Sequence, residues 1–125
     1  MESNMKHLSN WIEIPVRDMA RARRFYERIL QVELQPMDVG PVEYALFPSE
    51  DRYNCGALAR GDGYEPGPGG VTVYLDGGGD LDGIVDRVAG AGGTILMPKT
   101  YMGQEAGHVA MFLDSEGNRV GLQTP

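Results

Sequence analysis

The chain has 125 residues, with 11 Lys and Arg against 18 Asp and Glu, so its net charge is −7; 42% of it is hydrophobic and 23% charged. This length predicts one domain over residues 1–125, built as one unit or as two small units that share a core, and the composition argues against wholesale disorder. The negative charge argues against a nucleic-acid partner, and no apolar run approaches the roughly 20 residues of a membrane-spanning helix.

Two further features bear on the compartment. The first residues contain no basic segment followed by an apolar one, so we expect no signal peptide there. Cys55 is the only cysteine, and it cannot form a disulfide within the chain or a cysteine-based zinc site. We therefore expect a soluble, cytoplasmic protein without a membrane partner.

The first predicted strand covers residues 11–16. Ile12, Ile14 and Val16 alternate with Trp11 and Glu13, and this period of two is typical of a half-buried strand. The two sets of side chains should therefore face opposite sides of a sheet.

A helix is predicted next, with Asp18 as its N-cap, because apolar residues then recur at helical spacing. Its opposite face carries Arg21, Arg24 and Arg28, which we expect to face solvent. Strands are predicted over residues 32–35, 42–47 and 55–59, with a polar turn at 49–51.

The second half of the chain repeats this order. Residues 61–70 lack periodicity and are predicted to form a linker or surface loop, and a strand follows over 71–75. Asp80 or Asp82 caps a predicted helix that ends at the glycines of residues 90–93. Strands are expected over 94–97, where Pro98 ends the strand, and over 108–113 and 119–123, with a turn at 114–118.

The spacing of matched positions indicates a duplication. Asp18 and Leu34 bracket the helix and next strand of the first half, and Asp80 and Leu96 do so in the second, so that 80 − 18 = 96 − 34 = 62. The sequence thus predicts an α+β fold with two βαβββ modules, at residues 10–60 and 71–125. Neither module is large enough to bury its sheet alone, so the two must share a core or pair across a dimer.

Four motifs resemble the vicinal oxygen chelate superfamily, which includes glyoxalase I, extradiol dioxygenases and bleomycin-resistance proteins. They are IPVRD at residues 14–18, ARRFY at 22–26, GAGG at 90–93 and FLDSEGN at 112–118. The chain is most similar to the short bacterial glyoxalase-related branch. The resemblance implies a U-shaped cup of mixed β-sheet with the helices outside, and it places Trp11 and Glu13 inside the cup.

The resemblance also implies where a metal would bind, because the superfamily's metal enzymes take four inward-facing ligands from four strands. Trp11 occupies the first of these positions, and its indole N–H only donates. The second falls in residues 55–59, which contain no His, Asp or Glu; the third falls near Thr72, and the fourth is Gly121. Glu13, Glu43 and His108 are alternative donors without metal-specific spacing. We therefore expect no conventional metal site and no cofactor.

The remaining inward residues are the candidate site. Glu13 is a candidate general base or a partner for a cationic ligand group, and Trp11 is a candidate platform for a planar ligand. Thr72, Tyr74 and Gln123 are candidate ligand-binding residues of the second module. For each of these residues, ordinary packing or a local hydrogen bond is the alternative.

His108 is a second candidate acid–base group, because its imidazole titrates in the useful pH range. A lone histidine at the start of a strand is as readily structural. Residues 101–105 have glycines nearby and are a candidate flap over the cup, or an ordinary loop.

Several functions remain open at this point. The chain could be a glyoxalase-like cup protein that binds a small organic molecule, with metal-independent lyase or isomerase chemistry from Glu13 or His108. It could instead sequester a cationic drug without catalysis, as bleomycin-resistance proteins do, or be an interaction domain with a vestigial cup. Metal-dependent glyoxalase I activity is not expected, since it requires a Lewis acid. A homodimer is expected, because a partner commonly covers exposed sheet edges.

Overall fold

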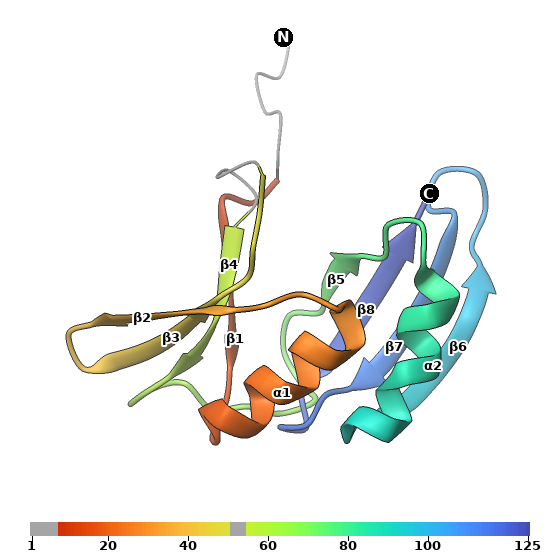
Figure 1. The fold of residues 1–125 in the computed structure, drawn as a ribbon. Coiled ribbons are helices and arrows are strands. Elements are labelled where there is room, and N and C mark those ends of the chain that lie inside the picture. The colour runs from red at the N-terminus through yellow and green to blue at the C-terminus, as the bar shows by residue number, and fades with distance from the viewer. Residues whose placement is uncertain (1–7, 51–54) are drawn as a thin grey trace, which may run out of the picture.

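The computed structural model describes residues 8–50 and 55–125, and its elements form two β-α-β-β-β modules (Figure 1). The first module comprises β1 (Trp11–Pro15), α1 (Met19–Leu30), β2 (Gln35–Val39), β3 (Val42–Leu46) and β4 (Cys55–Arg60). The second comprises β5 (Val73–Asp76), α2 (Leu81–Ala91), β6 (Thr94–Tyr101), β7 (His108–Leu113) and β8 (Arg119–Thr124). The predicted α+β fold is confirmed. Asp51 of the predicted turn lies outside the described residues.

Each module forms its own mixed sheet with the same strand order. The orders are β1-β4-β3-β2 and β5-β8-β7-β6, and in each module the first strand runs parallel to the last. The other neighbours are antiparallel. As a result, β1 and β5 are both edge strands in hydrogen-bonding terms, and each has one side without a strand partner among the described residues.

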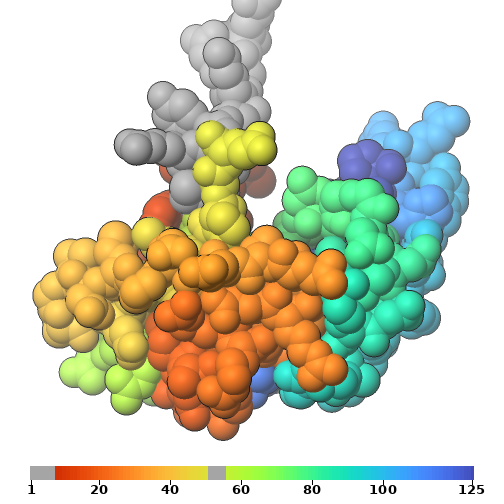
Figure 2. Space-filling model, in the orientation of Figure 1, coloured from red at the N-terminus to blue at the C-terminus, as the bar shows by residue number. Residues whose placement is uncertain are grey.

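A single hydrophobic core joins the modules on the side of the sheets that carries the helices. Helix α1 buries Ala22, Phe25, Tyr26 and Ile29. The Phe25 ring also lies 5.8 Å from the ring of Phe112 on β7, measured between centroids. Figure 2 shows α1 in orange across the middle of this face, beside α2. Because α1 packs on both sheets, neither module buries its apolar surface alone.

The helix ends carry the predicted Asp18 cap and, in addition, contacts from arginine side chains that were not predicted. The Asp18 carboxylate accepts a hydrogen bond from the backbone N–H of Arg21, as an N-cap does. Arg21, Arg24 and Arg28 are exposed as predicted, but Arg28 also donates to the carbonyl of Gly90 at the end of α2. In return, Arg87 of α2 donates to the carbonyl of Ile29. Each helix thus supplies a cation to the other's C-terminal end, where the helix dipole favours it.

The predicted strand over residues 32–35 is wrong. Gln31 takes the left-handed conformation with φ 55°, and the backbone N–H of Leu34 donates to the Glu27 carboxylate. Leu34 is fully buried beside the end of α1, so this apolar stretch closes the helix and β2 begins only at Gln35. The periodicity could not separate a strand from a buried helix-closing turn.

Pro98 does not end its strand, contrary to prediction. Strand β6 continues through it to Tyr101, and its pairing with β7 shifts register between Ile95 and Met97 and again between Met97 and Thr100. Proline is tolerated here because β6 is an edge strand and its pairing is irregular at this point. No ladder hydrogen bond is therefore required from the N–H group that proline lacks. The second helix ends as expected, with Gly92 at φ 108° following Ala91.

No helix among the described residues is long and apolar enough to cross a membrane.

Candidate functional site

A hollow of about 620 Å³ lies between β1 and β5 and contains four of the predicted site residues. We call it the β1–β5 hollow; it is lined by Leu8, Ser9, Trp11, Ile12, Glu13, Val71, Thr72, Val73 and Tyr74. Trp11 and Tyr74 remain 42% and 44% exposed, although aromatic side chains of this size are usually well buried. The structure therefore brings Trp11, Glu13, Thr72 and Tyr74 into one concave site.

Glu13 is held by two hydrogen-bond donors. The Trp11 indole Nε1 donates to Glu13 Oε2 at 2.9 Å, and the Tyr64 hydroxyl donates to Glu13 Oε1 at 2.6 Å. A carboxylate oxygen has two lone-pair sites, so each oxygen can still accept a bond from a ligand. The two bonds thus orient the carboxylate and leave it able to accept further hydrogen bonds.

Tyr64 is a site residue that the sequence did not indicate. It lies in the segment of residues 61–70 that was predicted only as a linker or loop, and no local pattern singles it out. Its hydrogen bond to Glu13, together with a hydrogen bond to Tyr44 and partial burial, raises the Tyr64 pKa well above its ordinary value of 10. The phenol therefore stays protonated and remains a donor at physiological pH.

Arg119, at the start of β8, contacts Thr72, which lines the opposite side of the hollow. Its Nη2 donates to Thr72 Oγ1 at 3.0 Å. Arg119 and Glu13 both line a smaller hollow of about 100 Å³, which shares Glu13, Val71 and Val73 with the β1–β5 hollow. Opposite charges therefore border this smaller hollow, which adjoins the β1–β5 hollow.

Tyr74 lies over Gly121 of β8, with which it is paired across the sheet. A Cβ atom at Gly121 would lie within 2.7 Å of three atoms of the Tyr74 ring. Glycine at this position thus makes room for the aromatic side chain that borders the hollow.

The other two predicted site residues lie elsewhere. His108 lines a separate hollow of about 110 Å³ together with Lys99, and its ring packs 5.2 Å from the ring of Tyr101. The Gln123 side-chain amide donates to the carbonyl of Ala106 and fastens the loop between β6 and β7. Neither residue lines the β1–β5 hollow, so the two candidate acid–base groups, Glu13 and His108, are not in one site.

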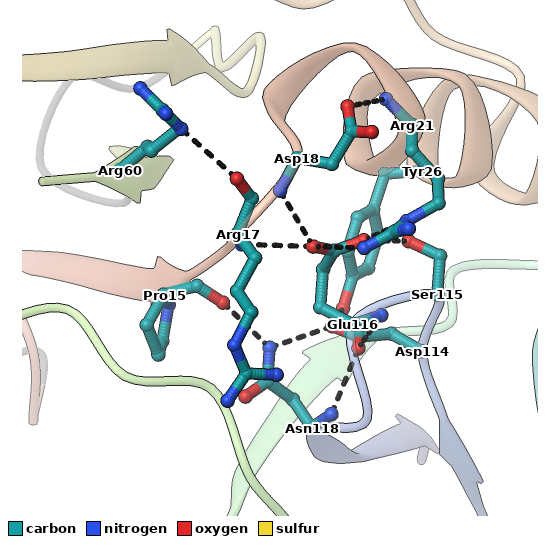
Figure 3. Close-up of polar contacts among 10 residues, drawn as sticks. All are labelled: Pro15, Arg17, Asp18, Arg21, Tyr26, Arg60, Asp114, Ser115, Glu116 and Asn118. Atoms are coloured by element: carbon teal, nitrogen blue, oxygen red, sulfur yellow. Dashed lines mark hydrogen bonds and ion pairs between the residues drawn. The ribbon is translucent and has the colours of Figure 1, made fainter.

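A buried polar network anchors the site to the rest of the molecule (Figure 3). Asp114 accepts hydrogen bonds from the Tyr26 hydroxyl and from the side chain of Asn118. Asn118 in turn donates to the carbonyl of Pro15, at the end of β1, and accepts from the backbone N–H of Gly67. The turn of residues 114–118 therefore fixes both β1, which carries Glu13, and the segment that carries Tyr64.

Comparison with known proteins identifies the family. The family described as "Glyoxalase/Bleomycin resistance protein/Dioxygenase superfamily" matches residues 8–122. The chain therefore belongs to this superfamily, which is the vicinal oxygen chelate superfamily that the motifs resemble.

Individual relatives are more distant. A Mycobacterium bovis protein named "Putative glyoxylase CFP32" is 28% identical over 122 residues, and the match covers 90% of this chain but only 44% of that protein. The chain thus spans less than half the length of this curated relative. A glyoxalase family protein from Bacillus cereus has a TM-score of 0.69 at 19% identity, covering 98% of this chain and 97% of its own. TnmS3, an antibiotic binding protein from Streptomyces sp. CB03234, has a TM-score of 0.64 at 22% identity, covering 99% of both chains.

The residues of the hollow do not fit the metal that enzymes of this superfamily use. Imidazole and carboxylate donors are needed, yet Trp11 presents an N–H donor, and the aromatic ring of Tyr74 fills the space above Gly121. Within residues 8–50 and 55–125, no three His, Cys, Asp or Glu side chains are grouped so that they could hold a metal ion.

Proposed function

We propose that this protein binds a small organic molecule with an aromatic group and a positive charge in the β1–β5 hollow. The observation that carries the proposal is the Glu13 carboxylate, oriented by Trp11 and Tyr64 at the edge of a hollow that two half-exposed aromatic side chains border. A ligand ammonium would meet the carboxylate while its ring stacks on Trp11 or Tyr74.

The energetics favour such a ligand. Burying an aromatic ring against Trp11 and Tyr74 removes apolar surface of both partners from water, and a cation near an aromatic face gains further electrostatic attraction. The net charge of −7 raises the local concentration of cationic molecules.

Sequestration of a cationic drug is one form of this function, and it needs no catalytic group. It is supported by the similarity of the fold to TnmS3, which is described as an antibiotic binding protein. The TM-score of 0.64 at 22% identity means that the two proteins share a fold.

Metal-independent lyase or isomerase chemistry is the second candidate function. It is favoured by the short hydrogen bond between Tyr64 and Glu13, because a phenol beside a carboxylate can relay a proton taken from a ligand. His108 lines another hollow, so this chemistry would use Glu13 as the base without His108 as its acid.

A thermal-shift screen tests the binding proposal. Tryptamine and cationic glycopeptide drugs should raise the melting temperature of the wild-type protein more than thiol conjugates and keto acids do. The Trp11→Ala and Glu13→Gln variants should lose this stabilisation. Glu33→Gln is a matched control, because Glu33 is exposed outside the hollow, and it should retain the wild-type response.

Equal stabilisation of wild type, Trp11→Ala and Glu13→Gln by the same compounds would refute the site. Mass spectrometry of each bound compound then separates the two candidate functions. A compound that returns unchanged from a saturated protein supports a binder, whereas conversion that Glu13→Gln abolishes supports an enzyme.

We further propose that the protein is a cytoplasmic homodimer. Strands β2 and β6 end the two sheets, and Leu96, Tyr101 and Met102 are exposed on or beside β6, where a second copy would cover them. Light scattering at micromolar concentration should give twice the 13.6 kDa of one chain, and a mass near 13.6 kDa would reject the dimer.

A further inference from the structure

The β1–β5 hollow adjoins a smaller hollow of about 100 Å³ that Glu13 and Arg119 both line. Glu13 stands on β1, and Arg119 stands on β8 beside Thr72 of the other module. The hydrogen bond from Arg119 Nη2 to Thr72 Oγ1 brings the guanidinium to a side chain that lines the hollow. Glu13 and Arg119 therefore approach this smaller hollow from opposite modules.

The two charges do not neutralise each other. No ion pair joins Arg119 to any acidic side chain among the residues that the structure describes, although six such pairs occur elsewhere in them. A guanidinium has five N–H donors, and the bond to Thr72 uses one of them. Arg119 is exposed, so its remaining donors can reach an incoming anionic group.

We infer that the ligand of this hollow is an aromatic zwitterion, with its ammonium at Glu13, its carboxylate or similar anion at Arg119, and its ring beside Trp11 and Tyr74. This inference rests on the proposed function, because it assumes that the hollow binds a ligand. A planar guanidinium matches a carboxylate with two parallel hydrogen bonds, so Arg119 selects for such a group in addition to adding charge.

Three small probes that differ only in charge test the inference. They are phenethylamine, which carries the cation alone, L-phenylalanine, which carries both charges, and 3-phenylpropionate, which carries the anion alone. Trp11 is the only tryptophan and lines the hollow, so its fluorescence reports binding directly. These probes do not absorb where tryptophan is selectively excited.

In the wild-type protein, L-phenylalanine should bind about fivefold more tightly than phenethylamine, as expected for one partly solvated ion pair. Arg119→Gln should remove this preference without weakening the binding of phenethylamine, because the lost guanidinium only repels an ammonium. Glu13→Gln should weaken binding of both amines but not of 3-phenylpropionate, because the Glu13 carboxylate only repels that anion. Arg24→Gln, an exposed arginine on α1 at the other face of the sheet, is the matched control and should behave as wild type.

The possible failures are distinguishable. If phenethylamine binds but L-phenylalanine binds no better, or if Arg119→Gln keeps the preference, the zwitterion inference is overturned and the proposed function stands. If none of the three probes changes Trp11 fluorescence at saturating concentration, both are overturned.

Discussion

Glu116, in the turn between β7 and β8, accepts a hydrogen bond of 2.6 Å from Arg21 Nε near the start of α1, and the Glu116 side chain is fully buried. Its Oε1 also accepts from the backbone N–H groups of Arg17 and Asp18 (Figure 3). One carboxylate of the second module thus accepts hydrogen bonds from the two backbone N–H groups that precede the first module's helix. It joins the modules at the point where β1 leads into α1.

This contact predicts how stability depends on pH. Burial alone would raise the Glu116 pKa, but the bonds from Arg21, the two backbone groups and Ser115 outweigh it and lower the pKa from 4.5 to about 2. Because the folded pKa is the lower one, the contribution to stability is complete above pH 4.5 and is lost as the pH falls through about 2.

We expect Glu116→Gln to lower the free energy of unfolding at neutral pH by roughly 3 kcal/mol, because lowering the Glu116 pKa from 4.5 to about 2 corresponds to a free energy of that size. Urea unfolding from pH 7 to pH 2 measures this, and the difference between variant and wild type should shrink toward the acid end. Glu105→Gln, at an exposed loop position, is the control. A difference that stays constant over the whole pH range would contradict the assignment.

The Tyr64–Glu13 hydrogen bond predicts that replacing Glu13 changes the pKa of Tyr64. Tyr64 has its pKa raised chiefly by the bond to Glu13 and next by the bond to Tyr44. In Glu13→Gln the negative charge is gone, so the Tyr64 pKa should fall back toward 10, and in Tyr44→Phe it should fall by less.

Ultraviolet absorbance of tyrosinate measures this titration, and Tyr64→Phe identifies the Tyr64 contribution among the six tyrosines. An identical alkaline titration in wild type and Glu13→Gln would show that the two side chains are not bonded in solution.

Gly121 predicts a way to disturb the hollow without disturbing the fold. In Gly121→Ala the new methyl group must displace the Tyr74 ring, and that ring is half-exposed and can turn toward solvent. The melting temperature should therefore change little, while tryptamine or phenethylamine should bind as weakly as they bind to Tyr74→Ala.

Gly79→Ala is the control, because a Cβ there meets nothing within 4 Å. A large loss of stability in Gly121→Ala would instead mean that Tyr74 is locked in place by the fold.

Several features of the fold could be predicted because their causes are local. The alternation of Ile12 and Ile14 with Trp11 and Glu13 predicts which face of β1 meets the core, and the Asp18 cap with its periodic apolar residues predicts α1. The strand predictions were wrong where the same local pattern is compatible with two structures. Residues 32–34 are apolar enough for a strand but close a helix, and Pro98 is compatible with an edge strand once the register shifts.

The candidate site was predictable only in part. Trp11, Glu13, Thr72 and Tyr74 follow from strand alternation and from the resemblance to the superfamily, and the structure places them in one hollow. Tyr64 and Arg119 gave no signal in the sequence, because one lies in a segment without periodicity and the other begins an ordinary strand. Their bonds to Glu13 and Thr72 span 51 and 47 residues of chain.

The sequence by itself therefore determined the α+β class and the duplicated βαβββ plan, since periodicity, capping and turn chemistry act over a few neighbouring residues. The tertiary structure alone decided that Tyr64 orients Glu13, that Arg119 lines an adjoining hollow with Glu13, and that His108 lies in a separate one. These relationships depend on how two modules pack through one shared core, and no local pattern of residues encodes a contact between distant segments.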